Sequence, residues 1–172
     1  MVPVIETERL ILRPHWQEDF PHCAAMWASP EVVRYIGGKP FTREEVWSRI
    51  LRYVGHWKWM GFGFWALEEK ATGAFAGELG FAEFQRDLDP PIVGVPEIGW
   101  VLAPHAQGKG YATEAVRAAV AWGDMRFERA RTVCLIDPEN QASIKVAENC
   151  GYREAQRVIY RNHATCLFER VL

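Results

Sequence analysis

The sequence lacks the features that would place the protein in a membrane, outside the cell or on nucleic acid. No apolar run approaches the ~18 residues of a membrane span, and the first ten residues, MVPVIETERL, lack the basic-then-apolar layout of a secretion signal. The net charge is -2 and the pI is about 6.2, so no overall positive field would attract nucleic acid or anionic lipid. These absences predict a cytoplasmic protein that binds neither nucleic acid nor membrane.

Cysteine and histidine are present, but without a disulfide or metal-binding pattern. Cys23, Cys134, Cys150 and Cys166 are far apart and show no C-x-x-C spacing, which predicts free, buried thiols in a reducing compartment. The pairs His22-Cys23 and His163-x-x-Cys166 are isolated, without a second pair at ligand spacing. We therefore expect no metal site.

The composition is that of an ordinary folded domain. The 172 residues include 49% hydrophobic and 24% charged residues, close to the averages of globular proteins. The chain contains no internal repeat, low-complexity tract or linker-like stretch. Its length and composition predict a single domain that covers residues 1–172.

Hydrophobic periodicity and turn residues predict alternating strands and helices. Strands are expected at 8–14, 62–68, 74–84, 97–103, 132–137, 158–160 and 166–172. Helices are expected at 17–29, 42–59 and 112–127, and between Asn140 and Gly151. Thr42 and Glu45 have the spacing of a capping box at the start of the second helix. The order predicts a mixed α+β sheet with helices on both faces, antiparallel in its first hairpins and with a right-handed crossover between the strands at 97–103 and 132–137.

The segment from Glu97 to Ala121 is the most informative part of the chain. A strand runs into a turn, Gln107-Gly108-Lys109-Gly110-Tyr111-Ala112, which opens a helix. The first turn of a helix offers unpaired backbone N–H groups and the positive end of the helix dipole, so glycines at this place predict a seat for a phosphate or diphosphate. The turn matches neither a Walker A loop nor a Rossmann fingerprint, and the alternative is an ordinary strand-to-helix connection.

The same turn matches Q/R-x-x-G-x-G/A, and it resembles the acetyl-coenzyme A signature of the GCN5-related N-acetyltransferases (GNAT family). Other segments resemble the ribosomal-protein N-acetyltransferase branch of that family, the RimJ/RimL type. They are Thr7-x-Arg9-Leu10-x-Leu12-Arg13, Gly61–Trp65, Glu97–Trp100 and Asn140-x-x-Ser143 followed by Gly151-Tyr152. The resemblance covers nearly the whole chain. It implies the GNAT fold, in which a mostly antiparallel sheet of about seven strands is flanked by about four helices and splayed between 97–103 and 132–137.

The resemblance also implies a set of residues that bind acetyl-coenzyme A as co-substrate. The diphosphate would lie on the backbone at Gly108, Lys109, Gly110, Tyr111, Ala112 and Thr113, with the side chain of Gln107 near it. The pantetheine arm would pair with the free edge of Trp100-Val101-Leu102 like an added strand. A backbone N–H near Val101 or Leu102 would stabilise the oxyanion of the tetrahedral intermediate. Asn140 and Ser143 would flank the thioester.

The reaction that the resemblance implies is direct attack of a primary amine on the thioester, which requires the amine to be neutral. A lysine amine, with a pKa of about 10.4, is neutral in about 1 part in 2,500 at pH 7, whereas an α-amine is neutral in about 10–20%. Glu97 is the first candidate base and Glu78 the second, the alternative being an ion-paired or surface carboxylate. Water alone stays a third option.

The departing thiolate can take a proton. Many family members use a tyrosine seven residues after the asparagine, but here that residue is Ala147. Ser143 fits the serine proposed for the ribosomal-protein branch, unless it only bonds the backbone of its own helix. Tyr152 is a weaker alternative.

The function implied is an N-acetyltransferase whose acceptor is a protein N-terminus or a small amine. The missing tyrosine keeps a second class open, a non-catalytic module that binds acyl-coenzyme A. The sequence leaves open which amine is the acceptor and whether the protein forms a homodimer.

Overall fold

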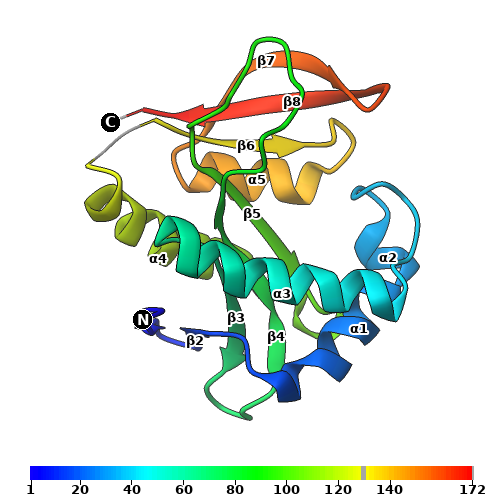
Figure 1. Ribbon diagram of the computed structural model, residues 1–172, viewed down its shortest axis with the longest axis vertical. Coiled ribbons are helices and arrows are strands. Elements are labelled where there is room, and N and C mark those ends of the chain that lie inside the picture. Colours follow the sequence, from blue (N-terminus) through cyan, green and yellow to red (C-terminus); the bar gives the residue numbers. More distant parts are fainter. Residues whose placement is uncertain (129–130, 172) are drawn as a thin grey trace.

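An eight-stranded mixed sheet organises the computed structural model, which describes residues 1–128 and 131–171 (Figure 1). The strand order is β1-β2-β3-β4-β5-β6-β8-β7. The strands are β1 (Ile5–Glu6), β2 (Leu10–Arg13), β3 (Phe64–Glu69), β4 (Phe75–Ala82), β5 (Glu97–Leu102), β6 (Thr132–Ile136), β7 (Arg153–Tyr160) and β8 (His163–Arg170). The helices are α1 (Phe20–Ala28), α2 (Pro30–Val33), α3 (Arg43–Met60), α4 (Tyr111–Arg126) and α5 (Gln141–Asn149).

Alternating side chains of the strands build two cores, one on each face of the sheet. On β3, Trp65 and Leu67 belong to the core that α4 and α5 cover, whereas Ala66 between them faces the core under α1, α2 and α3. Successive strand residues point to opposite faces, so a strand of buried residues requires cover on both sides. The expectation of helices on both faces is confirmed.

The start of α3 follows from its own sequence. The Thr42 hydroxyl accepts a hydrogen bond from the Glu45 N–H at 3.2 Å, and the Glu45 carboxylate accepts one from the Thr42 N–H at 2.7 Å. The expected capping box is therefore formed, and it satisfies two donors that a helix start would otherwise leave unpaired.

The sheet divides between β5 and β6. These strands are parallel and joined through the crossover helix α4, but their pairing is limited to Glu97 opposite Val133. On its other side β5 pairs with β4 over its whole length, from Glu97 to Leu102. Beyond Glu97 the second edge of β5 is therefore unpaired within the described residues, as the predicted splay requires.

The structure adds elements that the sequence pattern did not predict. The described residues form eight strands and five α-helices rather than about seven and four; the extra elements are the two-residue β1 and the four-residue α2. Strand β7 begins at Arg153, five residues before the predicted start at Val158. The prediction missed residues 153–157 because they are exposed on this outer strand and show no apolar alternation. The four cysteines are free and buried, as expected. No helix among the described residues is long and apolar enough to cross a membrane.

Candidate active site

The turn before α4 has unpaired backbone donors. Gly108 and Gly110 have φ angles of +74° and +80°, a conformation that favours glycine, and Gly110 is the N-cap of α4. The first N–H of this helix with a backbone partner is that of Glu114, which bonds Gly110 at 3.2 Å. Within the described residues, the N–H groups of 108–113 form no hydrogen bond to the protein. The turn therefore has the unpaired donors that an anion would need.

The approach to the turn is open. A Cβ atom placed on Gly108 would meet no atom within 4 Å, and one placed on Gly110 would meet only the Arg9 guanidinium, at 3.4 Å. Residues 107–110 are all exposed. A bulky anion can reach these backbone groups without displacing a side chain.

The loop between β1 and β2 holds the first turn of α4 in place. The Glu114 carboxylate accepts hydrogen bonds from the Thr7 hydroxyl at 2.6 Å, the Arg9 N–H at 2.8 Å and the Arg9 guanidinium at 2.7 Å. Arg9 also donates to the Lys109 carbonyl at 2.8 Å. Thr7 and Arg9, part of the opening motif, therefore fix the geometry of the turn from 100 residues away.

Side-chain charges around the turn are balanced. The Lys109 ammonium lies 3.6 Å from the Glu69 carboxylate, which also accepts a hydrogen bond from the Tyr111 hydroxyl. The Gln107 amide donates to the Leu102 carbonyl at 3.2 Å, so this side chain braces the end of β5. With two cations, Arg9 and Lys109, facing two carboxylates, the attraction for an anion comes mainly from the backbone N–H groups and the helix dipole.

The free edge of β5 continues from the turn. The Ala103 N–H bonds the Ala76 carbonyl on the β4 side at 2.9 Å. Because hydrogen-bonded pairs alternate along antiparallel strands, Val101 also bonds towards β4, whereas the N–H groups of Trp100 and Leu102 point to the unpaired edge. An extended chain that starts at the turn can pair with these two residues and run towards Glu97.

Asn140 and Ser143 begin α5, on the far side of the splay. The Asn140 side-chain oxygen accepts from the Ser143 N–H at 3.1 Å, so Asn140 is the N-cap that its position predicted. The Ser143 hydroxyl is partly exposed and has no hydrogen-bond partner within the described residues, so it is available to a ligand. Ala147 is fully buried. The buried Tyr152 hydroxyl lies 2.8 Å from the Thr132 hydroxyl and has a packing role.

Glu97 lies where β5 leaves β6, and its two oxygens are engaged. The Arg86 guanidinium donates to both of them, at 2.6 and 2.8 Å, and to the Tyr160 hydroxyl at 2.8 Å. Burial raises the pKa of Glu97, and the bond with Arg86 offsets only part of that effect. A raised pKa suits a base. Because Arg86 bonds both carboxylate oxygens, Glu97 can accept a proton only when one of these two bonds breaks.

Glu78, on β4, is completely buried on the α1 and α3 side. One of its oxygens accepts from the Trp27 indole at 2.9 Å and the Tyr53 hydroxyl at 2.5 Å, and the other lies 3.4 Å from the His15 ring. Burial opposes ionisation, but the His15 and Tyr53 contacts outweigh it, so the pKa of Glu78 is lowered. Cys23 completes a group of three metal-ligand types within 4.8 Å, yet burial raises the pKa of its thiol and disfavours the thiolate that a metal needs.

Sequence reasoning missed the partners of these residues. The ion pair of Glu97 with Arg86, the contact of Glu78 with His15 and the bond of Arg9 to Glu114 all join segments without a shared local pattern. Only the Thr7-x-Arg9 motif gave a signal, and the sequence did not indicate what these residues contact.

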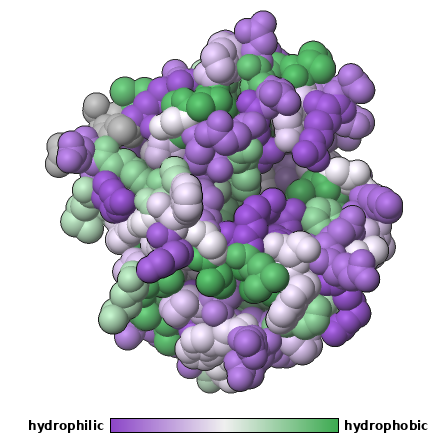
Figure 2. All heavy atoms as spheres, in the orientation of Figure 1, coloured by the Kyte–Doolittle hydropathy of each residue, from purple (hydrophilic) through white to green (hydrophobic). Residues whose placement is uncertain are grey.

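Figure 2 shows a hollow in the surface between α3 and the strands β6 to β8, on the side where the sheet opens.

Comparisons with known proteins agree with this geometry. Residues 9–153 match the family model of the acetyltransferase (GNAT) domain. The protein YkkB of Bacillus subtilis is 34% identical over 84% of this chain and 81% of its own length. A structure described as a GnaT-family acetyltransferase from Bordetella pertussis superimposes with a TM-score of 0.87, at 32% identity, over 99% of this chain and 100% of that one.

The RimL-type fold is also shared. RimL, a ribosomal L7/L12 α-N-protein acetyltransferase solved in complex with coenzyme A, superimposes with a TM-score of 0.80 over 99% of this chain and 98% of its own. At 18% identity this likeness concerns the fold alone. From the family match, the two closer relatives and the open turn beside a splayed sheet, it follows that the chain belongs to the GNAT family of acetyl-coenzyme A-dependent N-acetyltransferases.

Proposed function

We propose that the protein transfers an acetyl group from acetyl-coenzyme A to a primary amine by direct attack, without an acyl-enzyme. The observation that carries this proposal is the row of unpaired N–H groups at 108–113, which continues into the free edge of β5. Together they suit a diphosphate followed by an extended arm. One domain, residues 1–172, would carry the activity in the cytoplasm.

We assign the diphosphate to the backbone of 108–113, with Gln107 bracing the turn. The arm would pair with Trp100 and Leu102, and Val101 would form part of the wall beneath it. The arm would thus carry the thioester, which supplies the activated acetyl group, towards the start of α5 and Glu97. A free β5 N–H would then donate to the developing oxyanion, a contact worth about 10²–10³ in rate.

Proton movement is assigned to residues at the splay. Glu97 is the first candidate to take the amine proton, through water, because it lies where β5 and β6 separate and burial raises its pKa. Glu78 remains second, because all its neighbours are protein groups and it is wholly buried. The Ser143 hydroxyl, which is partly exposed and has no partner among the described residues, is assigned to relay a proton from solvent to the departing thiolate, and Asn140 to hold the start of α5 in position.

The acceptor is a protein N-terminal α-amine or a small amine. An α-amine needs the least help, because its pKa lies nearly three units below that of lysine, which corresponds to about 3.5 kcal/mol. RimL shares this fold and acts on the α-amine of a ribosomal protein, which supports the first choice. Glu97, acting through a water molecule, would then be a strong enough base to remove the amine proton.

Turnover tests the proposal directly. Thiol release from acetyl-coenzyme A should appear with at least one member of a panel of N-terminal peptides, polyamines and amino acids. Cofactor binding without turnover on any acceptor would favour the non-catalytic module, which Ala147 in place of the family tyrosine keeps open. Failure to bind the cofactor would contradict both assignments.

A further inference from the structure

One face of α3 is apolar and yet exposed. Trp47, Leu51 and Val54 are 42%, 54% and 55% exposed, while Val46 and Ile50 of the same helix are buried. Figure 1 shows α3 lying in front of the sheet, and Figure 2 shows hydrophobic residues in green along it. A row of exposed apolar side chains on a helix marks a contact surface.

The residues of this face follow a regular spacing. They form two overlapping rows in which steps of three and four residues alternate, and all of them are exposed: one row is Glu44, Trp47, Leu51, Val54 and Lys58, and the other is Glu44, Ser48, Leu51, Gly55 and Lys58. This is the spacing of helix pairs that cross at about 20° and stay in contact over their length. We refer to these seven residues as the outer face of α3.

We propose that the outer face of α3 is the contact between two copies of this chain, packed antiparallel about a twofold axis beside Leu51. Leu51 lies at the middle of α3, which runs from Arg43 to Met60. Residues equally far from Leu51 in opposite directions then face each other across the axis. In this register Glu44 faces Lys58, Trp47 faces Gly55, and Leu51 meets its own copy.

The outer face complements itself in charge. Neither Glu44 nor Lys58 forms an ion pair in the described part of its own chain. The antiparallel register gives each of them an opposite charge on the partner, twice per dimer. A parallel pair would instead place like charges together, so charge selects the antiparallel arrangement.

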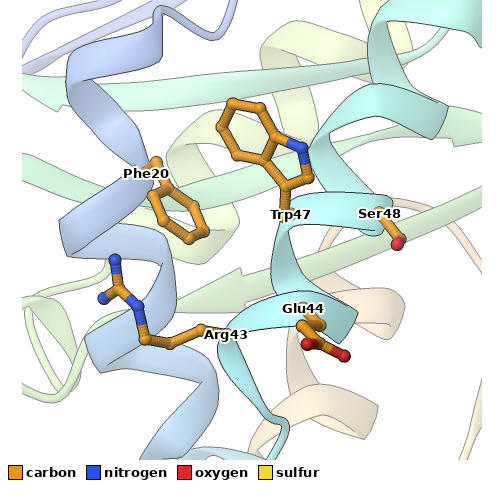
Figure 3. A pocket seen from close by; sticks show the side chains of 5 residues that line it. All are labelled: Phe20, Arg43, Glu44, Trp47 and Ser48. Atoms are coloured by element: carbon orange, nitrogen blue, oxygen red, sulfur yellow. The ribbon is translucent and has the colours of Figure 1, made fainter.

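The outer face also complements itself in shape. A Cβ atom on Gly55 would meet no atom within 4 Å, so there is free space above this glycine to receive the Trp47 indole of the other copy. Trp47 is already held by Phe20, whose ring it meets edge-on at 5.1 Å. Figure 3 shows these two rings on either side of a hollow between α1 and α3, with Arg43 beside them. A tryptophan fixed in advance loses little entropy on binding.

Association in solution tests the proposal. The helix pair is about 27 Å long and lies at the small end of specific interfaces, which bury about 1,200–2,000 Å², so sedimentation is measured from about 1 to 100 µM. We expect the mass to approach twice the 19.7 kDa of one chain. Leu51→Glu places like charges on the axis and should weaken the dimer at least about 30-fold, while its melting temperature should equal that of the wild type at a concentration where both are monomeric.

Ile159→Glu is the matched control, since Ile159 is 69% exposed on the outer strand β7, and this variant should remain dimeric. A wild-type chain that stays monomeric at 100 µM would overturn the proposal. So would a dimer that Leu51→Glu leaves intact, or one that Ile159→Glu alone disrupts. This inference does not depend on the proposed catalytic residues.

A charge exchange tests the register. Glu44→Lys and Lys58→Glu should each weaken association about 10-fold or more, because each change creates two like-charge contacts per dimer. The double variant exchanges the charges and should return to within about threefold of the wild type. A double variant as weak as the single ones would overturn the antiparallel pairing.

Discussion

Placing a negative charge at Gly108 is the sharpest way to test the anion seat. A side chain at this position enters open space, and its carboxylate would lie about 5 Å from a phosphate on the neighbouring N–H groups. At an effective dielectric constant of about 20, one such pair of charges repels by about 3 kcal/mol. Because the turn is exposed, solvent screening halves the repulsion to about 1.5 kcal/mol for each phosphate charge. Two phosphate charges then give about 3 kcal/mol, or about 100-fold in affinity.

The matched control is Gly108→Asn, which has nearly the same shape as Gly108→Asp and no charge. Gly108 has a φ angle of +74°, and asparagine and aspartate tolerate this region better than other side chains. Both variants therefore carry the same backbone cost, and their difference isolates the charge. Calorimetric titration with coenzyme A should give a dissociation constant about 100-fold higher for Gly108→Asp than for Gly108→Asn.

Salt sharpens the comparison. The gap between the two variants should shrink as ionic strength rises from 0.05 to 0.5 M, because screening acts on exposed charges. Equal affinities for the aspartate and asparagine variants, close to the wild-type value, would refute the reasoning, because no phosphate could then lie beside this turn.

Three further predictions concern the remaining site and the fold. Ser143→Ala should lower kcat with little change in cofactor affinity, and an unaltered rate in steady-state assays would remove Ser143 from the acid role. Glu97→Gln should lower kcat/KM by about 10²–10⁴ and abolish the acidic limb of the pH–rate profile, whereas Glu78→Gln should cost less than tenfold; the reverse order would reassign the base. Asp19→Asn removes the carboxylate charge that faces Arg13, in a contact whose side chains are 5% and 7% exposed; because Arg13 keeps its bond to Glu68 at 2.7 Å, the change should cost about 1.5–3 kcal/mol of unfolding free energy at pH 7. Burial opposes ionisation of Asp19, but the Arg13 bonds outweigh it and lower its pKa, so this contribution is complete above the unfolded pKa of about 3.9 and is lost as pH falls; urea titrations should show the gap closing towards pH 2, and a constant gap would contradict the assignment.

The elements that were predicted correctly are those specified by neighbouring residues. The capping box at Thr42 and Glu45 and the N-cap at Asn140 each depend on groups three residues apart. The glycine turn at 107–112 combines local backbone conformation with the helix that follows it. Such features could be read from sequence because the interacting groups lie within one turn of chain.

The elements that were missed depend on tertiary contacts. Residues 153–157 of β7 are all exposed and, apart from Ala155, polar; they form a strand because β8 pairs with them. The two-residue β1 likewise exists only because β2 lies beside it. Neither segment contains the alternation of apolar and polar residues that indicates a strand.

By itself the sequence determined the open glycine turn before α4, which family the chain resembles and how α3 and α5 begin, because local backbone geometry and short motifs fix these features. Tertiary structure alone decided the environment of each candidate base. The register of the sheet and the loop after β4 bring Arg86 to Glu97, and the packing of α1 and α3 on β4 encloses Glu78 with His15 and Tyr53. Charge and burial act through space, so the protonation of a carboxylate depends on residues that are neighbours only after folding.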